Sequence, residues 1–140
     1  MTQQIKDKVL IINTDGGSRG NPGPAGIGFV ISDHDKQLLL EQGKFIGVAT
    51  NNVAEYKALI AALQSAIKLG GTSLQILMDS ELIVKQMKGE YRVKDPNLKE
   101  LFLEVQTLLK EFDDYSFTHV LREFNKAADA QVNKAIDAAM

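Results

Sequence analysis

Four acidic residues stand at positions where a charge adds little to the stability of a fold, namely Asp15, Glu55, Asp79 and Asp129. Asp15 and Asp79 each follow a short apolar run, and the other two fall in the first turn of expected helices, beside residues that should face a core. Carboxylates gathered at strand ends and helix starts repel one another unless cations lie between them. Such a cluster is a candidate divalent-metal site, so the first hypothesis is a metal-dependent enzyme.

Each acid also has an ordinary explanation. Asp15 precedes a glycine, and Asp-Gly is a common turn dipeptide. Glu55 and Asp129 could complement the dipole of a helix, while Asp79 could cap the helix that follows it. We favour the metal site because one sheet topology brings all four residues to the same edge.

The apolar pattern predicts the elements that would position these residues. Three strands joined by short turns, an antiparallel meander, are expected over residues 8–14, 25–32 and 37–46, with a turn-forming loop at 15–24. Beyond them the pattern predicts a helix at about 50–70, a strand at 74–78, helices near 82–86 and 96–112, a strand at 115–121 and a helix at 127–139. Because a helix crosses between the first and fourth strands, these strands can lie parallel, and their carboxyl ends would bring Asp15 and Asp79 together.

Length and composition fit a single soluble domain, residues 1–140, which is long enough to bury a core. The sequence has no cysteine, which excludes disulfides, zinc–thiolate sites and catalytic thiols. His34 and His119 are too few for a zinc site built on several histidines. The N-terminal sequence lacks the apolar region of a signal peptide, and no apolar stretch approaches the ~20 residues needed to cross a bilayer. We therefore expect a cytoplasmic protein without a membrane partner.

The net charge of −2 argues against a general nucleic-acid binder, which is usually basic. If the four acids hold two divalent cations, however, the site itself is close to neutral. The segment from Lys85 to Lys99 also carries five basic residues against two acidic ones. This segment is either a contact for nucleic acid or a solvated helix face and loop.

Four blocks of the sequence resemble, in family order, those of type 1 ribonuclease H. They are Thr14–Gly28 (TDGGSRGNPGPAGIG), Thr50–Glu55 (TNNVAE), Met78–Ser80 (MDS) and Arg122–Asp129 (REFNKAAD), the last followed by Asn133–Ala135 (NKA). One block alone would be weak evidence. The ordered set spans nearly the whole chain and is highly specific.

The resemblance implies an α/β fold of the ribonuclease H type, a five-stranded mixed sheet flanked by helices in the order βββαβαβα. It implies an endoribonuclease that hydrolyses the RNA strand of RNA/DNA hybrids, largely independently of sequence, and leaves 5′-phosphate and 3′-hydroxyl ends. The catalytic and metal-binding residues would be Asp15, Glu55, Asp79 and Asp129, holding two Mg²⁺ ions, or Mn²⁺, with Asp15 bridging both. One ion would activate the attacking water, and the other would stabilise the leaving 3′-oxygen. We expect the protein to act as a monomer.

The resemblance also implies contacts with the substrate. The residues expected along the minor groove, where 2′-hydroxyl groups distinguish RNA from DNA, are Gly20, Asn21, Asn51 and Asn52. Thr50 matches a family position that contacts a phosphate of the DNA strand. Capping of the helix by the same Asn and Thr side chains is compatible with these roles.

Two segments are shorter than in many members of the family. Many relatives carry a long basic insertion rich in Lys and Trp, whereas residues 89–96 lead directly to the next helix and the chain has no tryptophan. Many also have a histidine in a mobile loop before the fourth acid, but residues 122–128 contain none. We expect Arg122 to contact the scissile region instead, and His119, inside the last strand, to be structural.

A third departure concerns the grip on the DNA phosphate. The arginine that some relatives use for it is replaced by Val48. The remaining residue of that pocket aligns with either Asp95 or Asn97.

Other classes of protein compete with this interpretation. Proofreading-type exonucleases usually open with Asp-x-Glu and aspartate-based phosphatases with Asp-x-Asp, whereas Asp15 is followed by two glycines. A catalytically silent module that only binds hybrids is a different class. Four intact acids argue against it, because a binding module has no need for a costly cluster of charges.

Overall fold

The computed structural model describes residues 7–140, and residues 1–6 of the expected 1–140 domain lie outside the described residues. The elements in chain order are β1 (Val9–Ser18), β2 (Gly23–Asp33), β3 (Leu38–Ala49), α1 (Asn51–Lys68), β4 (Ser73–Met78), α2 (Glu81–Met87), α3 (Pro96–Leu109), β5 (Asp114–His119), the 3₁₀ turn η1 (Arg122–Phe124) and α4 (Lys126–Ala139). The predicted order is confirmed, with two helices between β4 and β5. Among these helices, none is long and apolar enough to cross a membrane.

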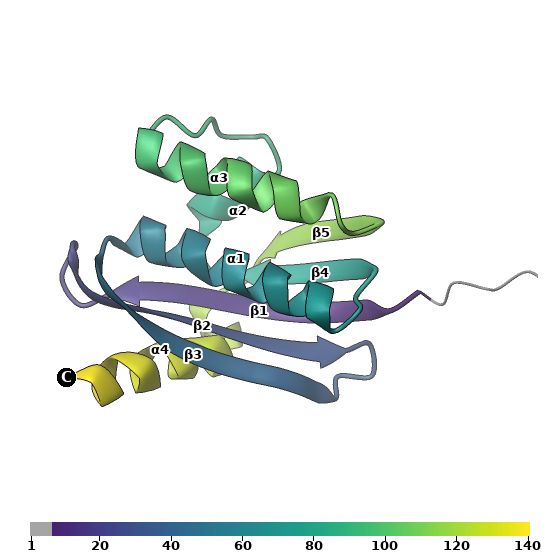
Figure 1. Ribbon diagram of the computed structural model, residues 1–140, viewed down its shortest axis with the longest axis horizontal. Helices are drawn as coiled ribbons and strands as arrows, with labels where there is room; N and C mark the ends of the chain where they lie inside the picture. Colours follow the sequence, from purple (N-terminus) through teal and green to yellow (C-terminus); the bar gives the residue numbers. More distant parts are fainter. Residues whose placement is uncertain (1–6) are drawn as a thin grey trace, which may run out of the picture.

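Within the described residues the strands form one mixed sheet in the order β3-β2-β1-β4-β5 (Figure 1). β1, β2 and β3 pair antiparallel through short turns, while β4 pairs parallel with both β1 and β5. β1 and β4 can run parallel because α1 crosses between β3 and β4. The predicted meander and the predicted parallel pair are therefore both confirmed.

The main core lies between the sheet and the layer formed by α1, α2 and α3 (Figure 1). On α1, Leu59 and Leu63 recur at helical spacing and are fully buried. They belong to the same apolar cluster as Leu10 and Ile12 of β1 and Ile76 of β4. α3 packs outside α1, so α1 is covered on both sides.

α4 covers the opposite face of the sheet, over β2, β3 and β1 (Figure 1). The apolar stripe of this amphipathic helix is buried at Ala128, Val132 and Ile136. The close approach needs glycine in the sheet, since a Cβ at Gly28 would lie 2.5 Å from the Ala128 carbonyl oxygen. α4 is thus seated directly on the backbone of the sheet.

The predicted loop over residues 15–24 is wrong for most of its length. β1 continues to Ser18 and β2 begins at Gly23, so only residues 19–22 connect them. Gly16 and Gly17 have the composition of a turn but pair with Ile27 and Gly26 in the antiparallel ladder. At Gly16 the lack of a side chain permits the close approach of α1 to the sheet and does not serve a turn.

Two later boundaries also differ from the prediction. β5 ends at His119, and Leu121, which was expected in the strand, is 58% exposed. α3 ends at Leu109, before Phe112, which packs into the core from the following turn.

Candidate active site and metal centre

Asp15 and Asp79 meet because of the register between β1 and β4. The last parallel pair joins Thr14 to Met78, and the two aspartates are the next residues of their chains. β4 ends at Met78 while β1 continues to Ser18. Asp15 therefore lies within β1, immediately after the last residue of β1 that pairs with β4. The expectation that both acids stand at one carboxyl edge is confirmed.

Glu55 reaches the same place from α1. Thr50 is the N-cap of this helix, and its hydroxyl accepts a hydrogen bond from the Val53 amide. Glu55 is therefore the fifth helical residue, and its prediction in the first turn is wrong. Glu55 Oε1 accepts a hydrogen bond from the amide of Gly16, which lies beyond the last residue of β1 that pairs with β4.

Gly16 makes this contact possible. A Cβ at Gly16 would overlap the backbone of Ala54 and Glu55, so a side chain there would push α1 away from β1. Two positions further on, the Ser18 amide donates to Asn51 Oδ1 over 2.8 Å. Beyond the end of β4, side chains of α1 thus accept the backbone hydrogen bonds along that edge of β1.

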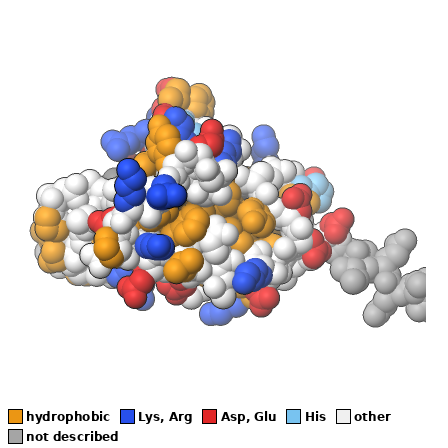
Figure 2. Space-filling model, turned by 90° about the horizontal axis from the view of Figure 1, so that it is seen from above, with side chains coloured by type: hydrophobic (Ala, Val, Ile, Leu, Met, Phe, Trp, Pro, Cys, Tyr) orange, Lys and Arg blue, Asp and Glu red, His pale blue; other side chains and the backbone are white. Residues whose placement is uncertain are grey.

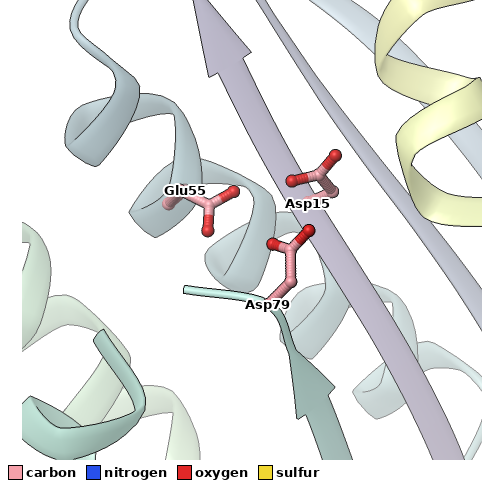
Figure 3. A group of neighbouring side chains, drawn as sticks. All are labelled: Asp15, Glu55 and Asp79. Carbon is pink, nitrogen blue, oxygen red and sulfur yellow. The ribbon is translucent and has the colours of Figure 1, made fainter. Parts of the chain in front are cut away.

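Asp129 lies in the first turn of α4, as predicted. Asn133, one turn later, donates from Nδ2 to Asp129 Oδ2 over 3.3 Å. The tightest group is formed by Asp15, Glu55 and Asp79, each with a carboxylate oxygen within 4.8 Å of the others (Figure 3). Asp129 stands beside this group and lines the same cavity.

Neither Asp79 nor Asp15 has the capping role that the sequence also allowed. Ser80, not Asp79, caps α2, since its hydroxyl accepts from the Ile83 amide over 3.3 Å. Asp79 is therefore left free of any capping duty. Asp15 sits in a ladder, so it does not cap a turn.

Burial and mutual repulsion make the cluster electrostatically unfavourable for three anions. Burial first, then the charge of Glu55, raises the pKa of Asp15 to about 10. Burial likewise raises the pKa of Glu55 to about 7, although its hydrogen bonds with Asp15 and the Gly16 amide oppose the shift. The pKa of Asp79 is also raised by burial, against the opposing charge of Arg122, whose Nε lies 3.9 Å from Asp79 Oδ2.

The donor set fits divalent cations. Glu55 Oε2 and Asp79 Oδ2 are buried and have no hydrogen-bond partner among the described residues. Unpaired carboxylate oxygens at this spacing are the hard ligands that Mg²⁺ and Mn²⁺ take. A bound cation would also reverse the raised pKa values, because it stabilises the ionised form of each carboxyl.

The four acids line one cavity of about 430 Å³. Asn51, Asn52 and Arg122, all expected to contact the substrate, line it as well. Arg122 projects from η1 with its side chain 85% exposed. The sequence analysis did not single out Arg19, whose Nη2 lies 2.6 Å from Asp137 Oδ1 at the rim of the same cavity.

A smaller cavity of about 240 Å³ adjoins the start of α1 and is lined by two further expected contacts, Asn21 and Thr50, but not by Gly20. Its polar lining residues are Asn21, Thr50, Asn52, Asp95 and Asn97. Asp95 and Asn97, the two candidates for the remaining residue of the DNA-phosphate pocket, therefore both line this cavity. Asp95 caps α3 by accepting from the Asn97 amide over 2.8 Å, and Val48 is 74% exposed outside this cavity.

The turn between β1 and β2 is tied to α1. Asn21 Oδ1 accepts a hydrogen bond from the Asn51 amide over 3.0 Å, and Gly20 has a positive φ of 97°. The expected minor-groove residues therefore lie near one another. His119 is not among the residues that line the 430 Å³ cavity. Its Nδ1 lies 4.0 Å from Glu81 Oε2.

Comparison with known proteins gives consistent results. The sequence profile of a family described as reverse transcriptase-like matches residues 13–135. The bifunctional protein Rv2228c of Mycobacterium tuberculosis is 49% identical over 131 residues, and ribonuclease HI of Halobacterium salinarum is 47% identical over 123. These alignments cover 93% and 88% of this chain, but 36% and 62% of the relatives.

The fold comparison is equally close. The crystal structure of LC11-RNase H1 in complex with RNA/DNA hybrid matches with a TM-score of 0.89 at 50% sequence identity. The match covers 93% of this chain and 98% of that one. The chain therefore spans only part of the two curated relatives named above, whereas the match includes nearly all of the solved LC11-RNase H1 chain.

Proposed function

Because this chain belongs to the type 1 ribonuclease H family, we propose that it is an endoribonuclease that hydrolyses the RNA strand of RNA/DNA hybrids. The observation that carries the proposal is the convergence of Asp15, Glu55 and Asp79, with two buried carboxylate oxygens that have no hydrogen-bond partner within residues 7–140. The family is metal dependent, and this acidic cluster is the place for the metal.

The acidic residues bind the metal ions, and Arg122 contacts the substrate. Asp15, Glu55, Asp79 and Asp129 hold two Mg²⁺ ions, or Mn²⁺, which when bound neutralise the charge that develops on a phosphodiester. Glu55 is held toward the others by the Gly16 amide, so its orientation is set before any ligand arrives. Arg122 contacts the scissile region of the RNA strand, a role supported by its exposed side chain and its position in the lining of the cavity. The products carry 5′-phosphate and 3′-hydroxyl ends.

Selection of the hybrid depends on small polar groups around the start of α1. Gly20, Asn21, Asn51 and Asn52 follow the minor groove, where backbone groups and amides contact 2′-hydroxyls without reading bases. Thr50 contacts a phosphate of the DNA strand from the 240 Å³ cavity. The described residues that line this cavity include no cation, so that contact relies on hydroxyl and amide donors.

Additional affinity comes from the basic segment around α2 and its following loop. Lys85 Nζ forms an ion pair with Glu81 Oε1 over 3.0 Å and lies 5.0 Å from the centroid of the Tyr91 ring. Lys88 and Arg92 are exposed. Figure 2 shows Lys and Arg side chains beside apolar ones on the face that carries α3. The exposed cations Lys88 and Arg92 take the place of the missing basic insertion by contacting phosphates of the hybrid.

We propose a single domain over residues 1–140, active as a monomer in the cytoplasm. The absence of cysteine is compatible with a reducing compartment. A native mass measurement and fractionation of the tagged protein would test both.

The deciding experiment is cleavage of an end-labelled RNA/DNA hybrid with Mg²⁺ or Mn²⁺, beside single-stranded RNA, RNA duplex and DNA duplex. We expect internal cuts in the RNA of the hybrid that a chelator abolishes. Asp15→Asn should lose at least ~10³-fold in rate, since it removes a ligand charge from the centre of the cluster. Glu104→Gln, on the exposed face of α3, is the matched control and should cleave normally.

Two results would reject the proposal. One is near wild-type cleavage by Asp15→Asn, because the cluster would then not be the active site. The other is binding of the hybrid without cleavage under either cation, which would indicate the silent binding module instead.

A further inference from the structure

Asn125 lies at the corner between η1 and α4 and is 1% exposed. It occupies the N-cap position of α4, yet its side chain makes no capping hydrogen bond. Asn at an N-cap is normally worth ~1 kcal/mol through that bond. The side chain of Asn125 makes its hydrogen bonds with another part of the fold.

The side chain is bound to β1 instead. Asn125 Nδ2 donates to the Thr14 carbonyl oxygen over 2.9 Å, immediately before Asp15. Asn13 Nδ2 in turn donates to Asn125 Oδ1 over 3.0 Å. Both hydrogen-bonding ends of the Asn125 amide are therefore used by two neighbouring residues of one strand.

The backbone of Asn125 carries this fixed position to the active site. Its amide donates to the Arg122 carbonyl oxygen over 2.9 Å, and its carbonyl oxygen accepts from the Asp129 amide over 3.1 Å. Arg122 and Asp129 both line the 430 Å³ cavity that holds the four acids, whereas neither Asn13 nor Asn125 does.

We propose that the Asn13–Asn125 pair is a positioning device that sets the first turn of α4, with Asp129 and Arg122, against the strand ends carrying Asp15 and Asp79. The inference rests on the proposed function and adds two residues to its machinery. Neither amide lines the cavity that would hold ligand, so the pair acts through the residues it holds.

The rest of α4 does not depend on this pair. The helix packs mainly on β2 and β3 through Val132 and Ile136, away from its first turn. Loss of the pair should therefore leave α4 docked but allow its N-terminal turn to shift. Loss of comparable outer-shell hydrogen bonds lowers metal affinity or activity by ~10–100-fold.

The test compares Asn125→Ala, Asn13→Ala and the double variant with the wild-type protein. The control is Tyr56→Phe, which removes another buried side-chain hydrogen bond, from Tyr56 Oη to Gln86 Oε1, between α1 and α2. Three quantities are measured: urea stability in EDTA, Mn²⁺ affinity by calorimetry without nucleic acid, and kcat and KM on the hybrid.

We expect Asn125→Ala to lower kcat ~10–100-fold and to weaken Mn²⁺ binding by a similar factor, with KM within ~3-fold of wild type. Asn13→Ala should change the same quantities less. The double variant should be no worse than Asn125→Ala, because the pair works as a unit. Tyr56→Phe should lose stability alone.

The proposal is overturned if the folded variants bind Mn²⁺ and cleave within ~2-fold of wild type, whatever stability they lose. Should Asn125→Ala fail to fold, Asn13→Ala decides the question, since Asn13 is only half-buried on β1. A wild-type protein that binds Mn²⁺ without cleaving would reject the nuclease function alone. The Mn²⁺ affinities of the variants would still support or overturn the positioning role.

Discussion

The metal-free protein should lose stability as the pH rises. Asp15 and Glu55 have folded pKa values of about 10 and about 7, against 3.8 and 4.5 for the free groups. Between pH 6 and 8 the folded chain therefore keeps at least one proton that the unfolded chain has released. Raised carboxyl pKa values stabilise the fold fully below the unfolded values, and this contribution is lost as the pH approaches the folded ones.

The magnitude follows from one retained proton. Each pH unit in this window lowers the free energy of unfolding by ~1.4 kcal/mol, so the step from pH 6 to pH 8 costs ~2.7 kcal/mol. That is a large share of the ~5–15 kcal/mol typical of a domain. Millimolar Mg²⁺ should flatten the dependence, because a bound cation favours the ionised carboxylates.

The assay is urea unfolding at pH 6, 7 and 8 in EDTA, repeated with Mg²⁺. Asp15→Asn should give a clearly flatter dependence in EDTA, since the amide does not titrate. Glu104→Gln, which alters an exposed carboxylate, should follow the wild-type protein. Stability that stays constant or rises between pH 6 and 8 in EDTA would refute the reasoning, because the cluster would then not be under electrostatic strain.

Three further outcomes follow from contacts described above. Gly16→Ala should destabilise the protein by ~1–3 kcal/mol or more through overlap with α1, whereas Gly17→Ala, whose Cβ would meet Val132 Cγ1 at 3.6 Å, should cost far less by thermal unfolding. Equal losses would remove the argument for close approach at Gly16. Lys88→Ala with Arg92→Ala should raise KM for the hybrid and reduce the salt slope of binding by ~2, while Lys36→Ala with Lys110→Ala changes neither; unchanged values in the first pair would mean a solvated face. Thr50→Ala should lose ~1 kcal/mol of stability with the cap of α1 and raise KM, and Thr50→Ser should restore both; a KM that stays at the wild-type value would limit Thr50 to capping.

The fold was largely predictable because apolar periodicity and caps are local signals. The strand before Asp15, the helix capped at Thr50 and the helix starting at Pro96 all follow from short windows of sequence. The loop at 15–24 was mispredicted because Gly16 has turn composition but serves a contact with α1. Such a contact joins residues far apart in the chain, so no local pattern reveals it.

The candidate site shows the same division. The meeting of Asp15 and Asp79 followed from parallel topology, but the competition between Asp79 and Ser80 for the cap of α2 required the structure. Asn125 was missed altogether. Its position before a helix suggests ordinary capping, while its actual partner, Asn13, lies 112 residues earlier.

The four carboxylates come from β1, α1, the end of β4 and α4, so they are spread over most of the chain. In genetic terms, this makes the site sensitive to truncation at almost any codon. A chain terminated after β5 would keep every strand of the sheet yet lack Asp129 and the Asn125 anchor. Stop codons at any position before Asp129 should therefore remove activity altogether, and selection against them should be as strong just before Asp129 as near Asp15.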